Sequence, residues 1–205
     1  MTRTRLVAFD LDGTLTRGQT CLQTLATAFG FADRMPIWGQ ARTDEEIRAA
    51  HAGVWEHLRH RTRREIAAAL SGIPLAPGAC EGIAALHRAG IRTVVVSLAL
   101  ASSVAYFAGR VGIEKIIAAE LDDNGRFDCV FPATKPTLLA GHARALRVTP
   151  DQIAAVGDSV GDVHMLRSAQ TSIYVGATLP DDCSPTWHLP AAPIDDIARL
   201  ILERH

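Results

Sequence analysis

The chain has 205 residues, of which 48% are hydrophobic and 21% charged, and its formal net charge is −1. This composition is typical of a well-cored globular protein, and the length fits one large domain or a domain with an insertion. A near-zero charge provides no global field for nucleic acid or an anionic membrane, and no apolar run approaches the ~20 residues of a membrane span, so we expect neither partner.

A short apolar run at residues 6–9 leads into Asp10 and Asp12, which are followed by Gly13 and Thr14. Such a run is typical of a buried parallel strand that delivers Asp10 to its carboxyl end, where open α/β sheets bind ligands. Two crowded carboxylates repel one another unless a cation lies between them or one holds a proton, which points to chemistry. On these residues alone a surface turn is an equal alternative, because Asp and Gly are common turn formers.

The next part of the chain, residues 16–76, contains helix patterns and no strand pattern. The helix patterns lie at residues 22–29, 43–58 and 62–72. The second and third open with a capping box, in which a Thr and a Glu three residues later satisfy N–H groups of the first turn. We therefore predict a core domain of residues 1–15 and 77–205, with an all-helical domain of residues 16–76 inserted after the first strand.

Strands and helices alternate in the remainder of the chain. Apolar, β-branched runs predict buried strands at residues 93–96, 153–156 and 172–175. Helix patterns lie at residues 79–89, 104–111, 135–146, 163–168 and 194–201. An Asn-Gly pair at 124–125, between residues 120–121 and 127–131, predicts a hairpin. The alternation favours an α/β fold with a parallel, doubly wound sheet.

Polar residues stand at the carboxyl ends of three predicted strands. They are Asp10 with Asp12, Ser97, and Asp158 with Asp162. In a doubly wound sheet such ends converge on one crevice, and Lys135, at the start of a helix, is a well-placed cation. Carboxylates, a hydroxyl and a lysine suggest a hard cation such as Mg²⁺ beside an anion pocket. One carboxylate could attack phosphorus while the metal and the lysine offset the charge.

Four motifs in this order resemble those of the haloacid dehalogenase superfamily. They are residues 10–14 (DLDGT), Ser97, Lys135 and residues 157–162 (GDSVGD). The resemblance spans residues 6–175. The helical insertion and the hairpin resemble the phosphoserine-phosphatase-like branch. The resemblance therefore implies a Rossmann-like core with a helical cap, and a phosphatase acting on a small-molecule phosphate ester.

The resemblance also implies roles for the acidic residues. Asp10 resembles the nucleophile that becomes an aspartyl phosphate, and Asp12 resembles the general acid/base. The Asp10 carboxylate, the Asp12 backbone carbonyl and Asp158 would hold Mg²⁺. Asp162 would not ligate the metal itself, but would orient a metal-bound water or Lys135. An acid two residues after the nucleophile fits the phosphatases and phosphomutases of the superfamily.

The phosphoryl oxygens would be held, by the same resemblance, by Ser97, Lys135 and the backbone at Leu98. A pair of glycines usually follows the motif serine, and here Leu98 and Ala99 stand in that place. Backbone N–H groups there can still bind phosphate, but the wall is bulkier.

Substrate recognition departs from the phosphoserine-phosphatase-like branch. Phosphoserine phosphatases have a Glu at the cap entrance where this chain has Gln19, and an amide pairs less well with an ammonium group. The stretch at residues 47–50 offers no clear counterpart of the arginine that grips the substrate carboxylate. Arg17 and Gln19 follow the catalytic loop closely enough to be candidates for substrate contact. These departures leave the substrate open but keep the phosphatase chemistry.

We therefore predict a Mg²⁺-dependent phosphomonoesterase. A phosphomutase or phosphotransferase that uses the same aspartyl phosphate is the nearest alternative, and a catalytically silent binding or regulatory protein on this fold is another. Four scattered cysteines without a Cys-x-x-Cys pair, and an apolar run after the N-terminus too short for a signal peptide, predict reduced thiols and a cytoplasmic location. The oligomeric state stays open.

Overall fold

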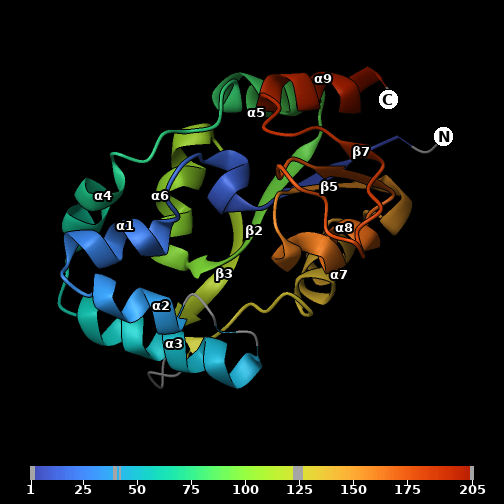
Figure 1. Ribbon diagram of the computed structural model, residues 1–205. Coiled ribbons are helices and arrows are strands. Elements are labelled where there is room, and N and C mark those ends of the chain that lie inside the picture. Colours follow the sequence, from blue (N-terminus) through green and yellow to red (C-terminus); the bar gives the residue numbers. More distant parts are fainter. Residues whose placement is uncertain (1–2, 39–40, 42, 122–126, 204–205) are drawn as a thin grey trace.

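The computed structural model describes residues 3–38, 41, 43–121 and 127–203, and a central β-sheet organises them (Figure 1). The order of its strands is β4-β3-β2-β1-β5-β6-β7; β4 runs antiparallel to β3, and the other neighbouring pairs are parallel. The strands are β1 Leu6–Phe9, β2 Arg92–Leu100, β3 Lys115–Leu121, β4 Phe127–Asp128, β5 Ile153–Gly157, β6 Thr171–Tyr174 and β7 Trp187–His188. The predicted doubly wound α/β fold is confirmed.

Helices cover both faces of the sheet, so its central strand β1 is fully buried. Val7 and Phe9 pack toward α5, α6 and α9, whereas Leu6 and Ala8 pack toward α7 and α8. These helices are α5 Ala79–Arg88, α6 Ala101–Val111, α7 Lys135–Ala145, α8 Val163–Ser168 and α9 Ile194–Glu203. Two covered faces explain why the strand sequences read as continuous apolar runs. Because the strands are parallel, their carboxyl ends meet at one edge of the sheet.

Between residues 16 and 76, the regular elements that the structure describes are helical. These are α1 Cys21–Ala28, a 3₁₀ turn Ala32–Arg34, α2 Met35–Trp38, α3 Asp44–Leu58 and α4 Arg63–Leu70. The predicted capping boxes at Thr43 and Thr62 are present, and a third, which the sequence reading missed, opens α1 at Thr20. Each box pairs the Thr hydroxyl with an N–H of the first turn, so three helix starts are fixed by local sequence.

The two connections between the helical segment and the sheet lie side by side. The N–H of Ala76 donates to the carbonyl of Leu15 at 2.8 Å, and the N–H of Arg17 donates to the carbonyl of Pro74 at 3.0 Å. The helical segment also shares one apolar core with the sheet, since Leu25 and Leu70 belong to the same buried cluster as the sheet-facing residues of α6.

Three strand features differ from the sequence reading. The parallel part of β3 was missed, although residues 116–119 form an apolar run as long as that of β1. Strand β7 was missed because it has only two residues at the sheet edge. Strand β2 continues past Ser97 to Leu100, and its register against β3 shifts between Val96 and Leu100. The antiparallel pairing of β3 with β4 fits the predicted hairpin, whose Asn-Gly turn lies outside the described residues.

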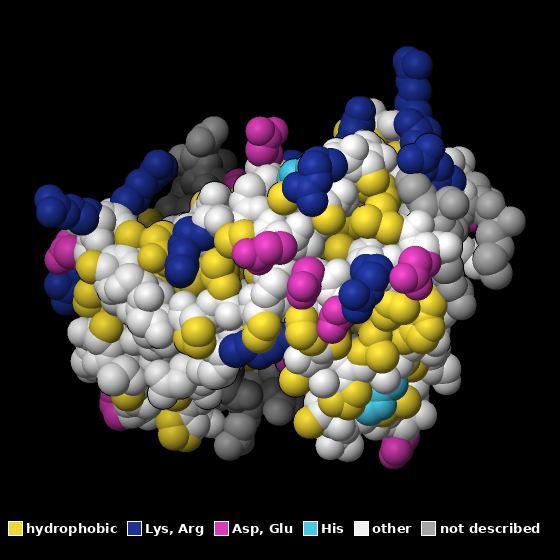
Figure 2. All heavy atoms as spheres, turned by 90° about the horizontal axis from the view of Figure 1, so that it is seen from above, with side chains coloured by type: hydrophobic (Ala, Val, Ile, Leu, Met, Phe, Trp, Pro, Cys, Tyr) yellow, Lys and Arg dark blue, Asp and Glu magenta, His cyan; other side chains and the backbone are white. Residues whose placement is uncertain are grey.

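The surface formed by α5 and α9 is mixed in character. Figure 2 shows basic and acidic side chains interspersed on this face, with small apolar patches between them. Within the described part of the chain, no helix is both long enough and apolar enough to cross a membrane.

Candidate active site

The turn after β1 brings two carboxylates to the carboxyl edge of the sheet. The N–H of Asp10 still donates to the β5 carbonyl of Val156 at 2.9 Å, and the N–H of Thr16 closes a wide turn onto the carbonyl of Leu11 at 3.0 Å. Gly13 within this turn has φ +85°, and a Cβ atom there would overlap the Asp158 carboxylate. A glycine is therefore required both for the backbone conformation and for the close approach of Asp158.

Lys135 joins two of the predicted site residues at the centre of the crevice. Its Nζ atom lies 2.8 Å from Asp10 Oδ1 and 2.6 Å from Asp162 Oδ1, and its side chain is completely buried. Burial favours the neutral amine, but the two carboxylates outweigh it and raise the pKa of Lys135. The ammonium group is therefore a fixed positive charge shared between Asp10 and Asp162.

Asp162 uses both of its oxygen atoms within the protein. Oδ1 accepts from Lys135, whereas Oδ2 accepts from the N–H of Asp158 at 3.2 Å and from the N–H and Oγ–H of Ser159 at 3.1 and 2.9 Å. A Cβ atom at Gly157 would overlap the Asp162 side chain, so the small residue allows this packing. Asp162 thus ties the loop after β5 to Lys135, which fits the predicted orienting role.

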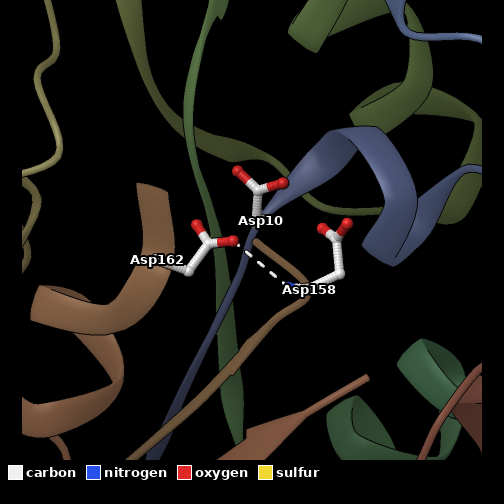
Figure 3. A group of neighbouring side chains, drawn as sticks. All are labelled: Asp10, Asp158 and Asp162. Atoms are coloured by element: carbon white, nitrogen blue, oxygen red, sulfur yellow. Dashed lines mark hydrogen bonds between the residues drawn. The ribbon is translucent and has the colours of Figure 1, made fainter. Parts of the chain in front are cut away.

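Asp10, Asp158 and Asp162 form an acidic cluster at the ends of β1 and β5. Each residue offers a carboxylate oxygen, and these oxygens lie within 4.8 Å of one another. Figure 3 shows the three side chains reaching the same region, Asp10 from the end of β1 and the other two from the segment after β5. Carboxylate oxygens are the donors that a hard divalent cation prefers, so this donor set fits Mg²⁺.

The electrostatics of the cluster favour a bound cation. Burial and the Asp162 carboxylate raise the pKa of Asp158 to about 6. Burial and Asp162 also raise the pKa of Asp10, although Lys135 opposes that rise. Thr14 Oγ1 donates to Asp158 Oδ1 at 3.0 Å and orients it. One buried lysine therefore faces three carboxylates, and a second positive charge would relieve their repulsion.

The Asp12 carboxylate lies apart from this cluster. Its Oδ1 accepts from the N–H of Cys21, the first residue of α1, at 2.9 Å. Burial raises the pKa of Asp12, and the hydrogen bond from Cys21 opposes the rise. A carboxyl with a raised pKa holds its proton closer to neutral pH, which is what a proton donor requires. Its side-chain separation from the cluster fits the prediction that only its backbone carbonyl faces the metal.

Ser97 and Leu98 lie in the irregular end of β2 and line the same cavity as Asp10 and Asp12. The Ser97 side chain is buried, and its Oγ accepts from the N–H of Ala99 at 3.2 Å. Leu98 extends toward Gly161 in the loop after β5. The structure thus brings Ser97, Leu98 and the carboxylates of Asp10, Asp12 and Asp158 around one space, whereas the buried Lys135 and Asp162 are not among its described lining residues.

Arg17 and Gln19 are not among the described residues that line this cavity. The Arg17 guanidinium donates instead to the carbonyls of Gly13, Thr14 and Ala192, so it braces the catalytic turn. Gln19 is exposed. Their predicted contact with substrate has no support in this arrangement.

The cavity has a volume of about 700 Å³ and extends from the carboxylates to the helical segment. Sequence reasoning missed most of its wall, which includes Leu22 and Leu25 of α1 and Ile47, His51 and Val54 of α3. Helical periodicity indicates that the apolar positions among them face inward, but it does not show whether they face the core or a cavity. His164 of α8 is exposed and also borders the cavity.

We expect replacement of Lys135 by Met to lower the free energy of unfolding by about 3–5 kcal/mol, because it leaves buried carboxylates without their partner. Urea denaturation in the presence of EDTA measures this loss. Lys115→Met, which changes the only other lysine of the chain at an exposed position, is the matched control. Equal losses in the two variants would show that the buried pairings do not stabilise the fold.

The doubly wound sheet and the acidic cluster with its buried lysine are typical of an α/β enzyme that transfers or hydrolyses a phosphoryl group. The chain belongs to the haloacid dehalogenase-like hydrolase family, whose sequence profile matches residues 7–167. It is thus a hydrolase, of the phosphatase type found among its relatives. It is 29% identical over 185 residues to a phosphoserine phosphatase from Halobacterium salinarum, covering 83% of this chain and 85% of the relative. A second phosphoserine phosphatase, from Albidiferax ferrireducens, is 27% identical over 193 residues, and the match covers 82% of this chain and 77% of the relative.

Solved structures confirm the fold. A phosphoserine phosphatase in apo form superimposes with a TM-score of 0.76 at 19% identity, covering 96% of this chain and 98% of the other. A structure described as a phospho-aspartyl intermediate analogue of phosphoserine phosphatase gives a TM-score of 0.75 at 19% identity, and the match covers 97% of this chain and 99% of the other. The similarity extends over the helical segment as well as the sheet.

Proposed function

We propose that the protein is a Mg²⁺-dependent phosphomonoesterase that hydrolyses a small-molecule phosphate through an aspartyl phosphate on Asp10. The observation that carries this proposal is the position of Asp10. Lys135 holds one of its oxygens at 2.8 Å, Asp158 lies beside it, and its side chain borders the cavity that Asp12 also lines. A structural neighbour described as a phospho-aspartyl intermediate analogue supports the covalent route.

In the first step, the carboxylate of Asp10 attacks phosphorus. Lys135 holds Oδ1, which leaves Oδ2 as the attacking atom. The new bond joins Asp10 Oδ2 to phosphorus, and the bond from phosphorus to the ester oxygen breaks. Asp12 gives its proton to that oxygen, so the alcohol leaves as a neutral molecule.

In the second step, Asp12 is a carboxylate and takes a proton from water. The water oxygen bonds to phosphorus while the bond to Asp10 Oδ2 breaks. Inorganic phosphate is released, Asp10 regains its charge and Asp12 regains its proton. The two steps balance without any other reactant, and they require only one group that both donates and accepts a proton.

The remaining site residues bind the metal ion and position the phosphoryl group. We assign the Mg²⁺ ligands to the carboxylates of Asp10 and Asp158 and the backbone carbonyl of Asp12. A cation there would offset the charge of the carboxylates and of the phosphoryl group. Ser97, the backbone N–H at Leu98 and Lys135 would hold phosphoryl oxygens.

We further propose that residues 16–76 act as a cap over the cavity and that the enzyme is cytoplasmic. The cap is supported by the adjacent chain crossings at Leu15 and Ala76 and by the cavity-lining residues of α1 and α3. The location is supported by four free cysteines. Transfer of the phosphoryl group to an alcohol instead of water, as in a mutase, remains the alternative reaction on the same intermediate.

The proposal is tested by phosphate release from 4-nitrophenyl phosphate. We expect turnover with Mg²⁺, loss of turnover in EDTA and recovery when Mg²⁺ is added in excess, because the crowded carboxylates need a cation before an anionic ester can approach. Full activity in chelator would exclude a metal role for the acidic cluster. Adding an excess of glycerol and measuring glycerol phosphate distinguishes hydrolysis from transfer.

The metal assignment predicts an order between two matched variants. Asp158→Asn should raise the Mg²⁺ concentration for half-maximal activity more than Asp162→Asn does. Both oxygens of Asp162 already accept hydrogen bonds from protein groups, so we expect it to act around the ligands and not as one of them. Mutation of such surrounding groups typically lowers metal affinity by about 10–100-fold. A Mg²⁺ titration of initial rates measures both values. The reverse order would make Asp162 a ligand.

A further inference from the structure

The wall of the cavity opposite the acidic cluster is apolar. Helix α1 contributes Leu22 and Leu25, helix α3 contributes Ile47 and Val54, and Leu98 lies beside the catalytic groups. Leu25 and Val54 are almost completely buried, so their side chains are packed in place and present a fixed surface. An organic group attached to phosphorus at Asp10 therefore faces this wall.

The charged side chains in the described lining are all carboxylates of the reaction centre: Asp10, Asp12 and Asp158. No Arg, Lys or Glu side chain belongs to that described lining. Arg48, on α3, does not turn inward, since its guanidinium lies over the Phe131 ring at 4.8 Å from the centroid. Apart from the exposed imidazole of His164, the described lining offers no cationic side chain to a substrate carboxylate, and its carboxylates belong to the reaction centre.

His51 is a buried polar group of this wall, as are Ser97 and Ser103, and its ring already has a partner within the protein. Its Nδ1 atom lies 3.3 Å from Cys129 Sγ, which joins α3 to the segment after β4. Burial lowers the pKa of His51, so the ring is neutral near physiological pH. A neutral ring with its own partners does not balance a substrate carboxylate.

We propose, on the basis of the phosphatase function above, that the substrate is a phosphate monoester of an uncharged, largely apolar alcohol and not a zwitterionic amino-acid phosphate. An alkyl or ring group gains by leaving water for this wall. An ammonium or a carboxylate buried against it would lose its hydration without a partner. A carboxylate would also approach the three acidic residues.

Leu22 and Leu98 are the residues that set this preference most directly. Leu98 lines the cavity with Asp10, and its side chain lies close to Gly161, so it narrows the space available to the group attached to phosphorus. Leu22 is only half-buried, so it tolerates polar replacements better than its fully buried neighbours. It is therefore the position at which the charge of the wall can be changed with least damage to the core.

The test compares three primary alkyl esters with similar leaving groups: n-butyl phosphate, phosphoethanolamine and O-phosphoserine. We expect kcat/KM for butyl phosphate to exceed that for each charged ester by about tenfold or more. The difference should arise mainly in KM, because the wall binds the alkyl group in the ground state and in the transition state alike. A smaller ratio for either charged ester, or a reversed order, overturns the proposal. If phosphoserine had the highest kcat/KM of the three, the substrate would instead be the one in the names of the relatives.

A matched pair of variants tests whether the wall itself is responsible. Leu22→Glu places a carboxylate in the wall, and Leu22→Gln has nearly the same shape and polarity without the charge. We expect the ratio of kcat/KM for phosphoethanolamine to that for butyl phosphate to be about tenfold higher in Leu22→Glu than in Leu22→Gln. Thermal unfolding confirms that both are folded. Equal ratios would show that the substrate does not contact this wall.

Failure of the substrate proposal can be told apart from failure of the phosphatase function. The same assays include 4-nitrophenyl phosphate, an activated ester that makes few demands on the wall. Turnover of this ester together with a preference for phosphoserine overturns the substrate class alone. An absence of turnover for all four esters with Mg²⁺ present overturns the proposed function and the substrate class together.

Discussion

Asp10→Asn is expected to lower kcat by roughly 10⁴–10⁶-fold, the range found when a covalent nucleophile is removed from a hydrolase. The amide has almost the same shape as the carboxylate, and its oxygen can still accept the hydrogen bond from Lys135 Nζ. It lacks the negative charge that attacks phosphorus. Initial rates on 4-nitrophenyl phosphate, followed by phosphate release, measure the loss.

The control for this variant is Asp181→Asn, which removes an exposed carboxylate outside the site. It should keep wild-type kcat, and both variants should unfold cooperatively at temperatures close to that of the wild type. Removing one of three crowded carboxylates relieves repulsion in the metal-free protein, so Asp10→Asn should not be less stable in EDTA. Retention of more than a few per cent of wild-type activity would rule out a covalent bond to Asp10.

The local parts of the site were predictable from sequence because each depends on a short segment. Strand β1 ends where its apolar run meets Asp10, and Gly13 is required by the turn that follows. Parallel strands share one carboxyl edge, so the convergence of Ser97 and Asp158 on that edge followed from the alternation of elements. The resemblance to the family then supplied roles that spacing alone does not define.

Long-range contacts were the part that sequence could not provide. Lys135 was expected near phosphate and, by resemblance, near Asp162, but its ion pair with Asp10, which lies 125 positions away in the sequence, was not predicted. Periodicity marked Leu25 and Val54 as inward-facing without showing that they border the same cavity as Asp10. Helical spacing predicts which face of a helix is apolar, and only tertiary packing decides whether that face meets core or ligand.

The sheet was read correctly where its strands are buried on both sides and less well at its edges. Strands β1 and β5 are apolar runs, because helices cover both of their faces. Strand β7, at one edge, has two residues and produces no hydrophobic pattern, whereas β3, next to the other edge, has four consecutive apolar residues that were not predicted as a strand. Edge strands are stabilised by pairing with a neighbour that is distant in sequence, which local propensity does not report.

The same structure predicts that Asp12→Asn slows hydrolysis by about 10²–10⁴-fold, the usual contribution of a general acid/base. The amide oxygen of the substituted side chain could still accept the N–H of Cys21, so the turn and its backbone carbonyl should keep their places. What is lost is the exchangeable proton, whose retention burial favours by raising the pKa of Asp12. Steady-state rates on 4-nitrophenyl phosphate and butyl phosphate measure the effect on a good and a poor leaving group.

The two steps should respond differently to this change. Nitrophenolate leaves without protonation, so formation of the aspartyl phosphate from the aryl ester should survive better than formation from the alkyl ester. Hydrolysis of the intermediate needs the activated water whatever the first alcohol was. Asp12→Asn should therefore accumulate phosphorylated Asp10 with the aryl ester, visible by intact-protein mass spectrometry as one added phosphoryl group that hydroxylamine removes. Equal losses on both esters without a trapped adduct would make Asp12 a positioning residue, and the proton would have to come from another group that borders the cavity, of which His164 is the exposed candidate.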